Sequence, residues 1–369
     1  IQLLRGNEVD FRVKGGVSDL ITGQGLDLDI DGRSSDPQVL SWLLFMKRDK
    51  VESLSLSGRI VEEHGRFLLR GVDARARSRQ GLEPRLSGNT RLPSRKEPRP
   101  ADGEALSFKL TAPSMAALNL PEFGKLPEFG RVTGSASYRP YRDGTGFFDV
   151  RLEAGTEEQV RATATGSIGY IPYTFDTGPS EIDLDVNLSA VDSATLGEVL
   201  DYKLPELGAV RLDMQVTGDT GNLRVDGIRL ETGPADQPVI RASGSLRTHF
   251  REHTSTMALS LDAAVADIVA SFRLVPSGYL GRVGGSVELS DVDGSWGLDR
   301  FDVASSQTDL YTLKFSGSLD DVIKRDRAEI TITAEIPDPG AFGRAADINL
   351  AGISPYRLDG VLELRDRQL

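Results

Sequence analysis

The sequence predicts a mostly β protein, built as an elongated, twisted antiparallel sheet whose apolar side forms a trough. Three observations predict this class: apolar and polar residues alternate with period two, glycines recur at regular intervals, and only 7% of the residues are aromatic. Period-two alternation places one face of a strand against apolar material and the other in water. We therefore expect repeats of roughly 75 residues, each with about four strands and one short helix.

The central stretch 182–247 shows the pattern most clearly. Its first strand, IDLDVNLSA (182–190), alternates aliphatic side chains with Asp, Asn and Ser. A short helix-like piece, DSATLGEVL (192–200), and the motif LPELG (204–208) follow. Three further alternating runs are VRLDMQVTG (210–218), NLRVDGIRLE (222–231) and VIRASGSLR (239–247).

Two sets of glycines indicate that this unit recurs along the chain. The first set closes the last strand of each unit, with spacings of 72, 78, 78 and 73 residues, at Gly16, Gly88, Gly166, Gly244 and Gly317. The second set ends LPEFG, LPELG and VPSGYLG, with spacings of 78 and 73, at Gly130, Gly208 and Gly281. Because the spacing changes from 78 to 73 residues at the same place in both sets, chance similarity is a poor explanation.

The opening strands of the units are LDLDIDG, LSFKLTA, IDLDVNLSA, MALSLDAAV and AEITITAEI. They predict the following division: 1–25, the end of a truncated repeat; 26–105, 106–181, 182–256 and 257–327, four repeats; and 328–369, the start of a truncated repeat. This division favours a chain that is a piece of a longer protein.

Short helices are expected after the opening strands. Residues 36–37 and 338–339 are both Asp-Pro, an N-cap residue followed by a proline suited to the first helical position. In the first copy, aliphatic residues then follow at helical spacing: Val39, Leu40, Leu43 and Leu44. Helices of about two turns are not stable alone, so we expect them to cover apolar surface.

One short helix cannot cover the apolar face of four strands. Either a second layer packs on that face, or the sheet curls until the face lines a trough. The small aliphatic residues and the glycines favour the trough. The residues predicted to line its groove are Leu28, Ile30, Leu106, Phe108, Leu110, Ile182, Leu184, Val186, Leu188, Leu212, Met214, Leu259, Leu261, Leu313, Phe315, Ile330 and Ile332.

Composition narrows the function classes. The net charge of −12 argues against nucleic acid as a partner, because phosphate backbones are bound by basic surfaces. The absence of cysteine excludes disulfides, thiolate catalysis and cysteine-based zinc sites. The longest nearly apolar run, VLSWLLFM (39–46), is far shorter than the roughly 20 residues of a membrane-spanning helix.

An arginine- and proline-rich region at 75–104 interrupts the pattern. Apart from RLSGNTRL, which belongs to a strand, this region indicates an exposed basic loop. The alternatives are a solvated loop and a patch that touches headgroups or a polymer.

Two motifs resemble metal sites but sit in the wrong context. HFREH (249–253) fits the H-x-x-E-H metalloprotease pattern, yet it joins two strands rather than lying on a helix. DLDIDGRSSDPQ (27–38) resembles a calcium loop, but its twelfth position is Gln38 rather than Glu. We expect no metal, no cofactor and no enzymatic activity.

The order of alternating strand, short helix, LPELG and SGSL strand resembles the AsmA-like family of Gram-negative bacteria, which includes the TamB group. The resemblance is most specific in LPEFGRVTGSASY (126–138), LPELGAVRLDMQVTG (204–218) and SLSGRIVEEHGRFLLRGVDARA (55–76). It implies a periplasmic protein, anchored in the inner membrane by a helix outside this chain. It also implies a groove that conducts phospholipid acyl chains between the inner and outer membranes.

Two other functions stay open. The chain could be a structural or assembly factor for outer-membrane proteins, with an outer-membrane protein as its partner, or a repetitive surface stalk.

Overall fold

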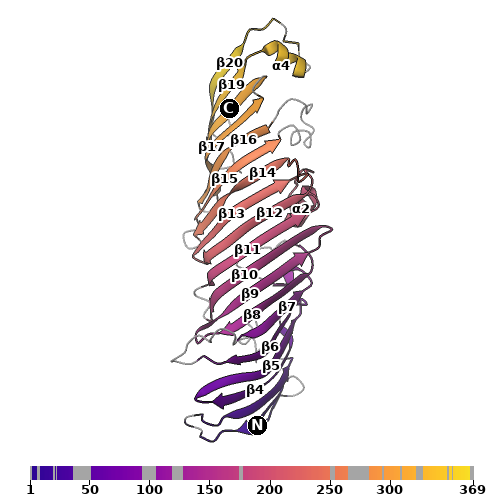
Figure 1. Cartoon of the computed structure of the whole chain (residues 1–369), viewed down its shortest axis with the longest axis vertical. Coiled ribbons are helices and arrows are strands. Elements are labelled where there is room, and N and C mark those ends of the chain that lie inside the picture. Colours follow the sequence, from indigo (N-terminus) through magenta and orange to yellow (C-terminus); the bar gives the residue numbers. More distant parts are fainter. Residues whose placement is uncertain are drawn as a thin grey trace. The chain divides into compact units, whose positions relative to one another are not determined.

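A computed structural model describes most of the chain. The described residues are 2–5, 9–19, 21, 23–35, 51–93, 105–118, 128–173, 178–249, 254–264, 282–292, 295–307, 310–320, 327–346, 349–350 and 352–365. The chain divides into two compact units: residues 1–156 with 161–184, and residues 157–160 with 185–369. Each unit consists mainly of antiparallel strands that pair in chain order (Figure 1), so the predicted mostly β, open antiparallel class is confirmed.

In the first unit, consecutive strands from β1 to β10 pair antiparallel. These strands are β1 (Gln2–Arg5), β2 (Val9–Gly16), β3 (Asp27–Ser34), β4 (Val51–Glu63), β5 (Arg66–Ser78), β6 (Glu83–Arg91), β7 (Leu106–Ala112), β8 (Val132–Pro140), β9 (Gly144–Gly155) and β10 (Val160–Pro172). The strand β11 (Ser180–Ala190) begins in the first unit and ends in the second.

In the second unit, consecutive strands from β12 to β20 likewise pair antiparallel. They are β12 (Val210–Asp219), β13 (Asn222–Thr232), β14 (Ile240–His249), β15 (Thr254–Ala264), β16 (Arg282–Val292), β17 (Ser295–Gln307), β18 (Tyr311–Leu319), β19 (Arg327–Ile336) and β20 (Tyr356–Arg365). The strands expected from alternation at 210–218, 222–231 and 239–247 are confirmed as β12, β13 and β14.

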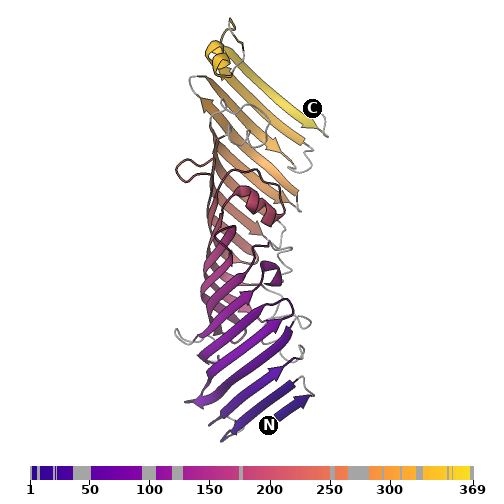
Figure 2. The same cartoon turned by 90° about the vertical axis from the view of Figure 1, so that its right-hand side faces the viewer.

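The described helical segments follow strands β7, β11 and β19, which are spaced by four and then eight strands. They are η2 (Met115–Leu118) after β7, α2 (Ser193–Leu200) after β11 and α4 (Pro339–Ala346) after β19. Figure 2 shows α2 and α4 beside the ends of their strands. The predicted helices at 192–200 and after residue 338 are therefore confirmed, while the one expected after residue 36 lies outside the described residues. None of the described helices is long and apolar enough to cross a membrane.

Asp192 explains why α2 and the LPELG motif occur together. One carboxylate oxygen caps the helix by accepting from the Ala194 N–H at 2.6 Å, and the other accepts from the Gly208 N–H at 3.0 Å. The Ser193 hydroxyl accepts from the Leu207 N–H at 2.8 Å. The start of the helix thus holds the motif in place, and Gly208 has the left-handed φ of 80° that favours glycine.

Close approach of the next strand explains three of the recurrent strand glycines, but not Gly88, where a Cβ would lie 3.7 Å from its nearest neighbour. A Cβ on Gly166, Gly244 or Gly317 would overlap the carbonyl oxygen of Asp183, Ala258 or Glu329 respectively. In the first unit Gly15 makes the same approach, whereas a Cβ on Gly16 would meet no atom within 4 Å. The choice of Gly16 as the recurrent glycine was therefore wrong by one residue. Sequence letters alone cannot tell which of two adjacent glycines makes the contact.

A second recurrent feature is a bulged position with left-handed backbone. Gly71, Asp149 and Gly227 have φ values of 59°, 50° and 61°, and each is 78 residues from the next. The pairing shifts next to Gly71 and Gly227, where one strand carries an extra residue. The spacing of these left-handed positions is consistent with the proposed division into repeats, which stays a prediction.

The basic region at 75–104 is not one loop. Residues 75–78 belong to β5 and residues 83–91 to β6, so Arg75, Arg77, Arg85 and Arg91 stand on paired strands. The alternation in VDARARS and EPRLSGNTR indicates these two strands. The many arginines and prolines of the region led instead to the prediction of a loop. Residues 94–104, the most proline-rich part, lie outside the described residues.

Candidate functional site

The apolar face is the side of the sheet to which the aliphatic residues of alternating strands point. In an antiparallel ladder, directly opposed residues share a face, so the register fixes its membership. In the second unit one row runs across seven strands without a charged residue: Gly244, Leu259, Val287, Phe301, Gly317, Ile330 and Leu362.

A parallel row two residues further along the same strands is also uncharged: Ala242, Leu261, Gly285, Val303, Phe315, Ile332 and Gly360. Leu212 opposes Leu230, which opposes Ala242, so the second row continues to β12. Leu313 opposes Ala334 in a third row, and Met214 follows Leu212 on the same face. The predicted groove residues of the second unit therefore share one face.

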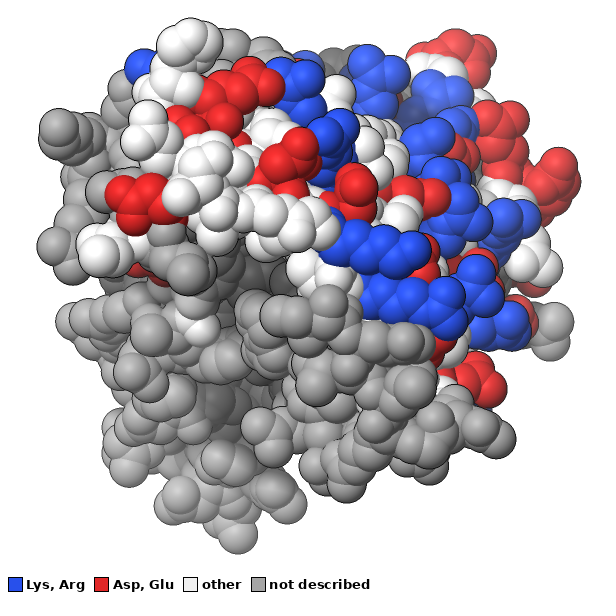
Figure 3. Space-filling model, turned by 90° about the horizontal axis from the view of Figure 1, so that it is seen from below, with Lys and Arg blue, Asp and Glu red and all other residues white. Residues whose placement is uncertain are grey.

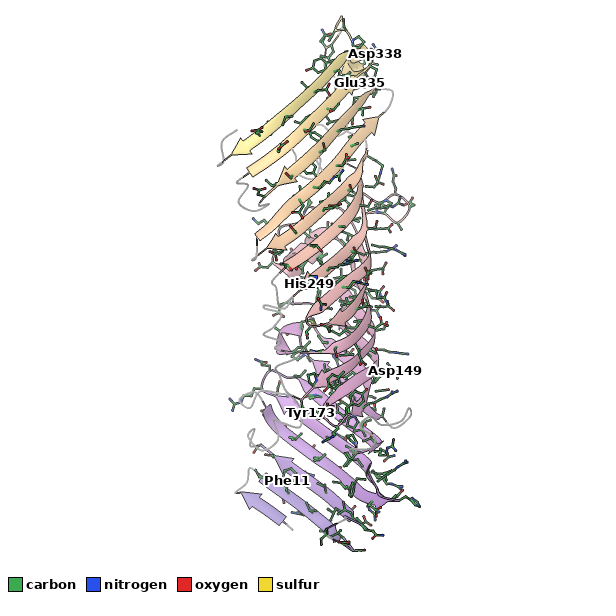
Figure 4. The ribbon with its side chains drawn as sticks, turned by 90° about the vertical axis from the view of Figure 1, so that its left-hand side faces the viewer. Phe11, Asp149, Tyr173, His249, Glu335 and Asp338 are labelled. Atoms are coloured by element: carbon green, nitrogen blue, oxygen red, sulfur yellow. The ribbon has the colours of Figure 1, made fainter. Side chains whose placement is uncertain are left out.

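The first unit has a corresponding apolar face. The row Phe11, Gly32, Leu56, Ala74, Leu86, Phe108 and Ala136 crosses β2 to β8. Leu28 and Ile30 oppose Ile60 and Gly58 on this face, and Leu106 and Leu110 lie two residues either side of Phe108. Figure 4 marks Phe11.

The remaining predicted residues lie on β11, the strand that runs from one unit into the other. Ile182, Leu184, Val186 and Leu188 are half-buried, and the Asp and Asn residues between them are exposed. The backbone of Leu184 lies beside Gly166, as that of Leu259 lies beside Gly244. Leu106 likewise lies beside Gly88, and Ile330 beside Gly317. The predicted groove residues Phe108 and Ile332 lie two residues away on the same face.

Burial differs between the margin and the middle of the apolar face. We call the strand ends from which η2, α2 and α4 depart the helical margin. There Ala112 and Val132 are 3% and 2% exposed in the first unit, and Val210 is 2% exposed in the second. Met115 and Leu118 of η2 pack on this margin with Leu82 and Ala154. In the second unit Leu212 and Leu259, further from the margin, are only half-buried, and so is Leu184 on β11. In the first unit the middle is more closed, since Leu106 and Ala74 are 2% and 8% exposed.

No second sheet covers the middle of the face among the described residues, since all described strands belong to one sheet. The two-layer alternative is therefore wrong for this part of the chain. In the second unit the result is an apolar surface with a buried helical margin and a half-buried middle.

Aromatic side chains gather at the opposite margin of the first unit. The Phe147 ring makes edge contacts with Phe108 and Tyr138, with centroids 5.1 and 5.5 Å apart. Tyr173, labelled in Figure 4, donates its hydroxyl to the Tyr141 carbonyl at 3.4 Å. Burial raises the pKa of Tyr173 well above its usual range, so this hydroxyl stays neutral. Sequence reasoning missed Tyr138, which stands between Ser137 and Arg139, and Phe147, whose neighbours Gly146 and Phe148 break the alternation.

The described parts of the two metal-like motifs lie mainly in strands. Asp27 lies in β3 and accepts two hydrogen bonds from Arg59, which lower the pKa of its carboxyl. His249 ends β14 with Nδ1 2.5 Å from the Asn222 side-chain oxygen, and its motif partners lie outside the described residues. Within the described ranges, no cluster of His, Asp and Glu is arranged to hold a metal.

Comparison with known proteins returned no match to a family model, to a curated protein or to a solved structure.

Proposed function

We propose that the apolar face binds lipid acyl chains and that the protein conducts phospholipid between two membranes. The observation that carries the proposal is the pair of uncharged rows across β14 to β20, which lie away from the buried helical margin. A contiguous apolar surface that a protein leaves partly exposed is usually an interaction site. An extended hydrocarbon chain fits a row because both are long, apolar and free of hydrogen-bonding groups.

The floor of these rows suits a sliding hydrocarbon better than a fixed protein partner. Protein interfaces concentrate their affinity in aromatic or arginine anchors seated in pockets. Here Gly244, Gly285 and Gly317 alternate with aliphatic residues along the rows, and a Cβ at each would overlap a neighbouring backbone oxygen. Phe301 and Phe315 are the two aromatic residues of the rows, and the other members are aliphatic residues and glycines. Most contacts along the floor are therefore weak and similar, which is what passage along the face requires.

The resemblance to the AsmA-like family supports placing this activity in the periplasm. On this proposal an inner-membrane anchor lies outside the present chain, and phospholipid moves toward the outer membrane. If lipid does not bind, two other functions are favoured. The protein would then be an assembly factor that accepts the strands of outer-membrane proteins, or a surface stalk.

The test is native mass spectrometry of the purified chain with a matched pair of variants. Leu259→Asp places a carboxylate in the apolar row, whereas Ser260→Asp places the same group on the other face, opposite Ser243 and Ser286. Phospholipid should travel with the parent chain and with Ser260→Asp, and be lost from Leu259→Asp, because an ionised carboxylate beside hydrocarbon costs several kcal/mol. Absence of phospholipid from the parent, or equal lipid on both variants that circular dichroism shows to be folded, would reject the proposal.

A further inference from the structure

A row of basic side chains crosses the polar face of the first unit, on the side opposite its apolar face. The register sets five residues directly opposite one another on β3 to β7: Arg33, Ser55, Arg75, Arg85 and Lys109. Adjacent strands are roughly 4.8 Å apart, so the last three cations are close neighbours. Like charges directly opposed on a sheet destabilise it, and the chain as a whole carries a net charge of −12. This local concentration of positive charge therefore needs an explanation.

The described carboxylates do not match these cations one for one. Asp73 accepts from both neighbouring guanidinium groups, at 3.2 and 2.8 Å from Arg75 and at 2.9 and 3.2 Å from Arg85. Arg33 and Lys109 form no ion pair with any carboxylate in the described part of the chain.

Other arginines on this face are paired differently. Arg59 binds the Asp27 carboxylate, and Arg70 has Glu63 as a separate partner. Among the described residues, Asp73 is the one carboxylate bound to cations of the row, and Asp10, which the register sets opposite Arg33, is paired with Arg12.

The row lines a hollow. It has a volume of about 730 Å³, within the range of sites for small ligands. Besides the row, its walls include Arg77 and the two carboxylates of Asp10 and Glu83. Figure 3 shows Lys and Arg side chains gathered on one side of the surface seen from the N-terminal end.

The guanidinium groups keep donors for a ligand. Arg75 and Arg85 each use Nε and one terminal nitrogen on Asp73. A guanidinium has five N–H donors, so each retains its other terminal nitrogen, and a lysine ammonium has three donors. Asp73 limits the rotamers of both arginines, which reduces the entropy lost when a ligand binds.

We propose that this basic hollow binds an anionic ligand that carries two phosphate groups. One group would bind between Arg85 and Lys109, and the second near Arg75, Ser55 and Arg33, with Arg33 roughly two strand spacings from Arg75. Arginine forks and lysine ammonium groups are the usual protein donors to phosphate oxygens. The chemistry is shared by a lipid headgroup with two phosphates and by a soluble diphosphate, and it does not depend on lipid binding at the apolar face.

The experiment uses the whole chain and two probes. Inorganic pyrophosphate is titrated calorimetrically, and phosphatidylcholine vesicles with and without cardiolipin are tested by co-sedimentation. Arg85→Gln and Lys109→Gln each remove one cation of the row. Arg59→Gln is the matched control, because it removes one exposed arginine from the same face outside the hollow. Circular dichroism checks that all three variants fold.

Each row variant should weaken binding by about tenfold or more, the usual effect of losing a charged hydrogen bond, while Arg59→Gln should leave it within about twofold. Binding of pyrophosphate alone identifies a soluble ligand, and binding of cardiolipin vesicles alone identifies a headgroup. The proposal is overturned if neither probe binds, or if Arg59→Gln weakens binding as much as the row variants do.

Discussion

Gly166 and Asp183 approach so closely that a Cβ on the glycine would overlap the carbonyl oxygen of the aspartate. Gly244 has the same relationship to Ala258. Backbone atoms on both sides leave no flexible side chain to move aside. The contact therefore requires glycine for steric reasons, and Gly166 also has a φ of 141°, which other residues rarely adopt.

The first prediction concerns these glycines. Gly166→Ala and Gly244→Ala should each lower the free energy of unfolding by about 2–4 kcal/mol, because the next strand must move to admit the methyl group. Gly16→Ala, with open space at its Cβ, should change it by less than about 0.5 kcal/mol. Urea titrations of the three variants measure this, and equal losses would show that the close approach is not the cause.

A second prediction concerns the left-handed position that Asp149 shares with Gly71 and Gly227. Asp149→Gly should raise the free energy of unfolding by up to about 1 kcal/mol, because glycine adopts φ near 50° without strain. Asp302→Gly, in a regularly paired part of β17, should lower it by about 0.5–1 kcal/mol. Thermal denaturation of both variants distinguishes these signs, and destabilisation by Asp149→Gly would contradict the backbone argument.

The third prediction concerns the connection between α2 and LPELG. Asp192→Ala removes the helix cap and the bond to the Gly208 N–H together, and should cost about 1–2 kcal/mol. Asp185→Ala changes an exposed carboxylate on β11 and should cost less than about 0.5 kcal/mol. Chemical denaturation followed by circular dichroism compares them, and similar costs would show that Asp192 does not anchor the motif.

These elements show how far sequence reasoning reaches. Alternation located β7, β11, β12, β13 and β14 within a few residues, because period two is a direct consequence of one apolar and one wet face. The groove residues that it selected share a face within each unit, since register preserves the face; that they line a lipid groove stays a prediction.

Sequence reasoning failed where the answer depends on how neighbouring strands are placed in space. Gly15 and Gly16 are identical letters, and only the position of the Asp27 backbone distinguishes them. Arg75 and Arg85 are far enough apart in the sequence to suggest a loop, yet pairing of β5 with β6 sets them opposite each other. Cross-strand neighbours cannot be identified until the register is known, so the basic hollow was invisible in the sequence.

The fourth prediction follows from the pKa of Asp73. Hydrogen bonds from Arg75 and Arg85 lower the pKa of this carboxyl below its ordinary value of 3.8, so the folded state favours the ionised form. Its contribution to stability is therefore complete above about pH 4 and is lost as pH falls through the lowered value. Asp73→Asn should flatten the acid side of the stability curve, whereas Asp31→Asn serves as a control on the same face. An unchanged acid limb in Asp73→Asn would show that these hydrogen bonds do not form in solution.

The central claim is that acyl chains lie on the apolar face, and site-specific photocrosslinking in cells tests it most directly. A photoreactive residue is placed at Leu259 or Phe315, on the apolar face, and at the adjacent Ser260 or Ser316, on the polar face. Mass spectrometry of the purified adducts should find phospholipid joined at positions 259 and 315 and not at positions 260 and 316. Phospholipid adducts at all four positions alike, or at none of them, would contradict the account.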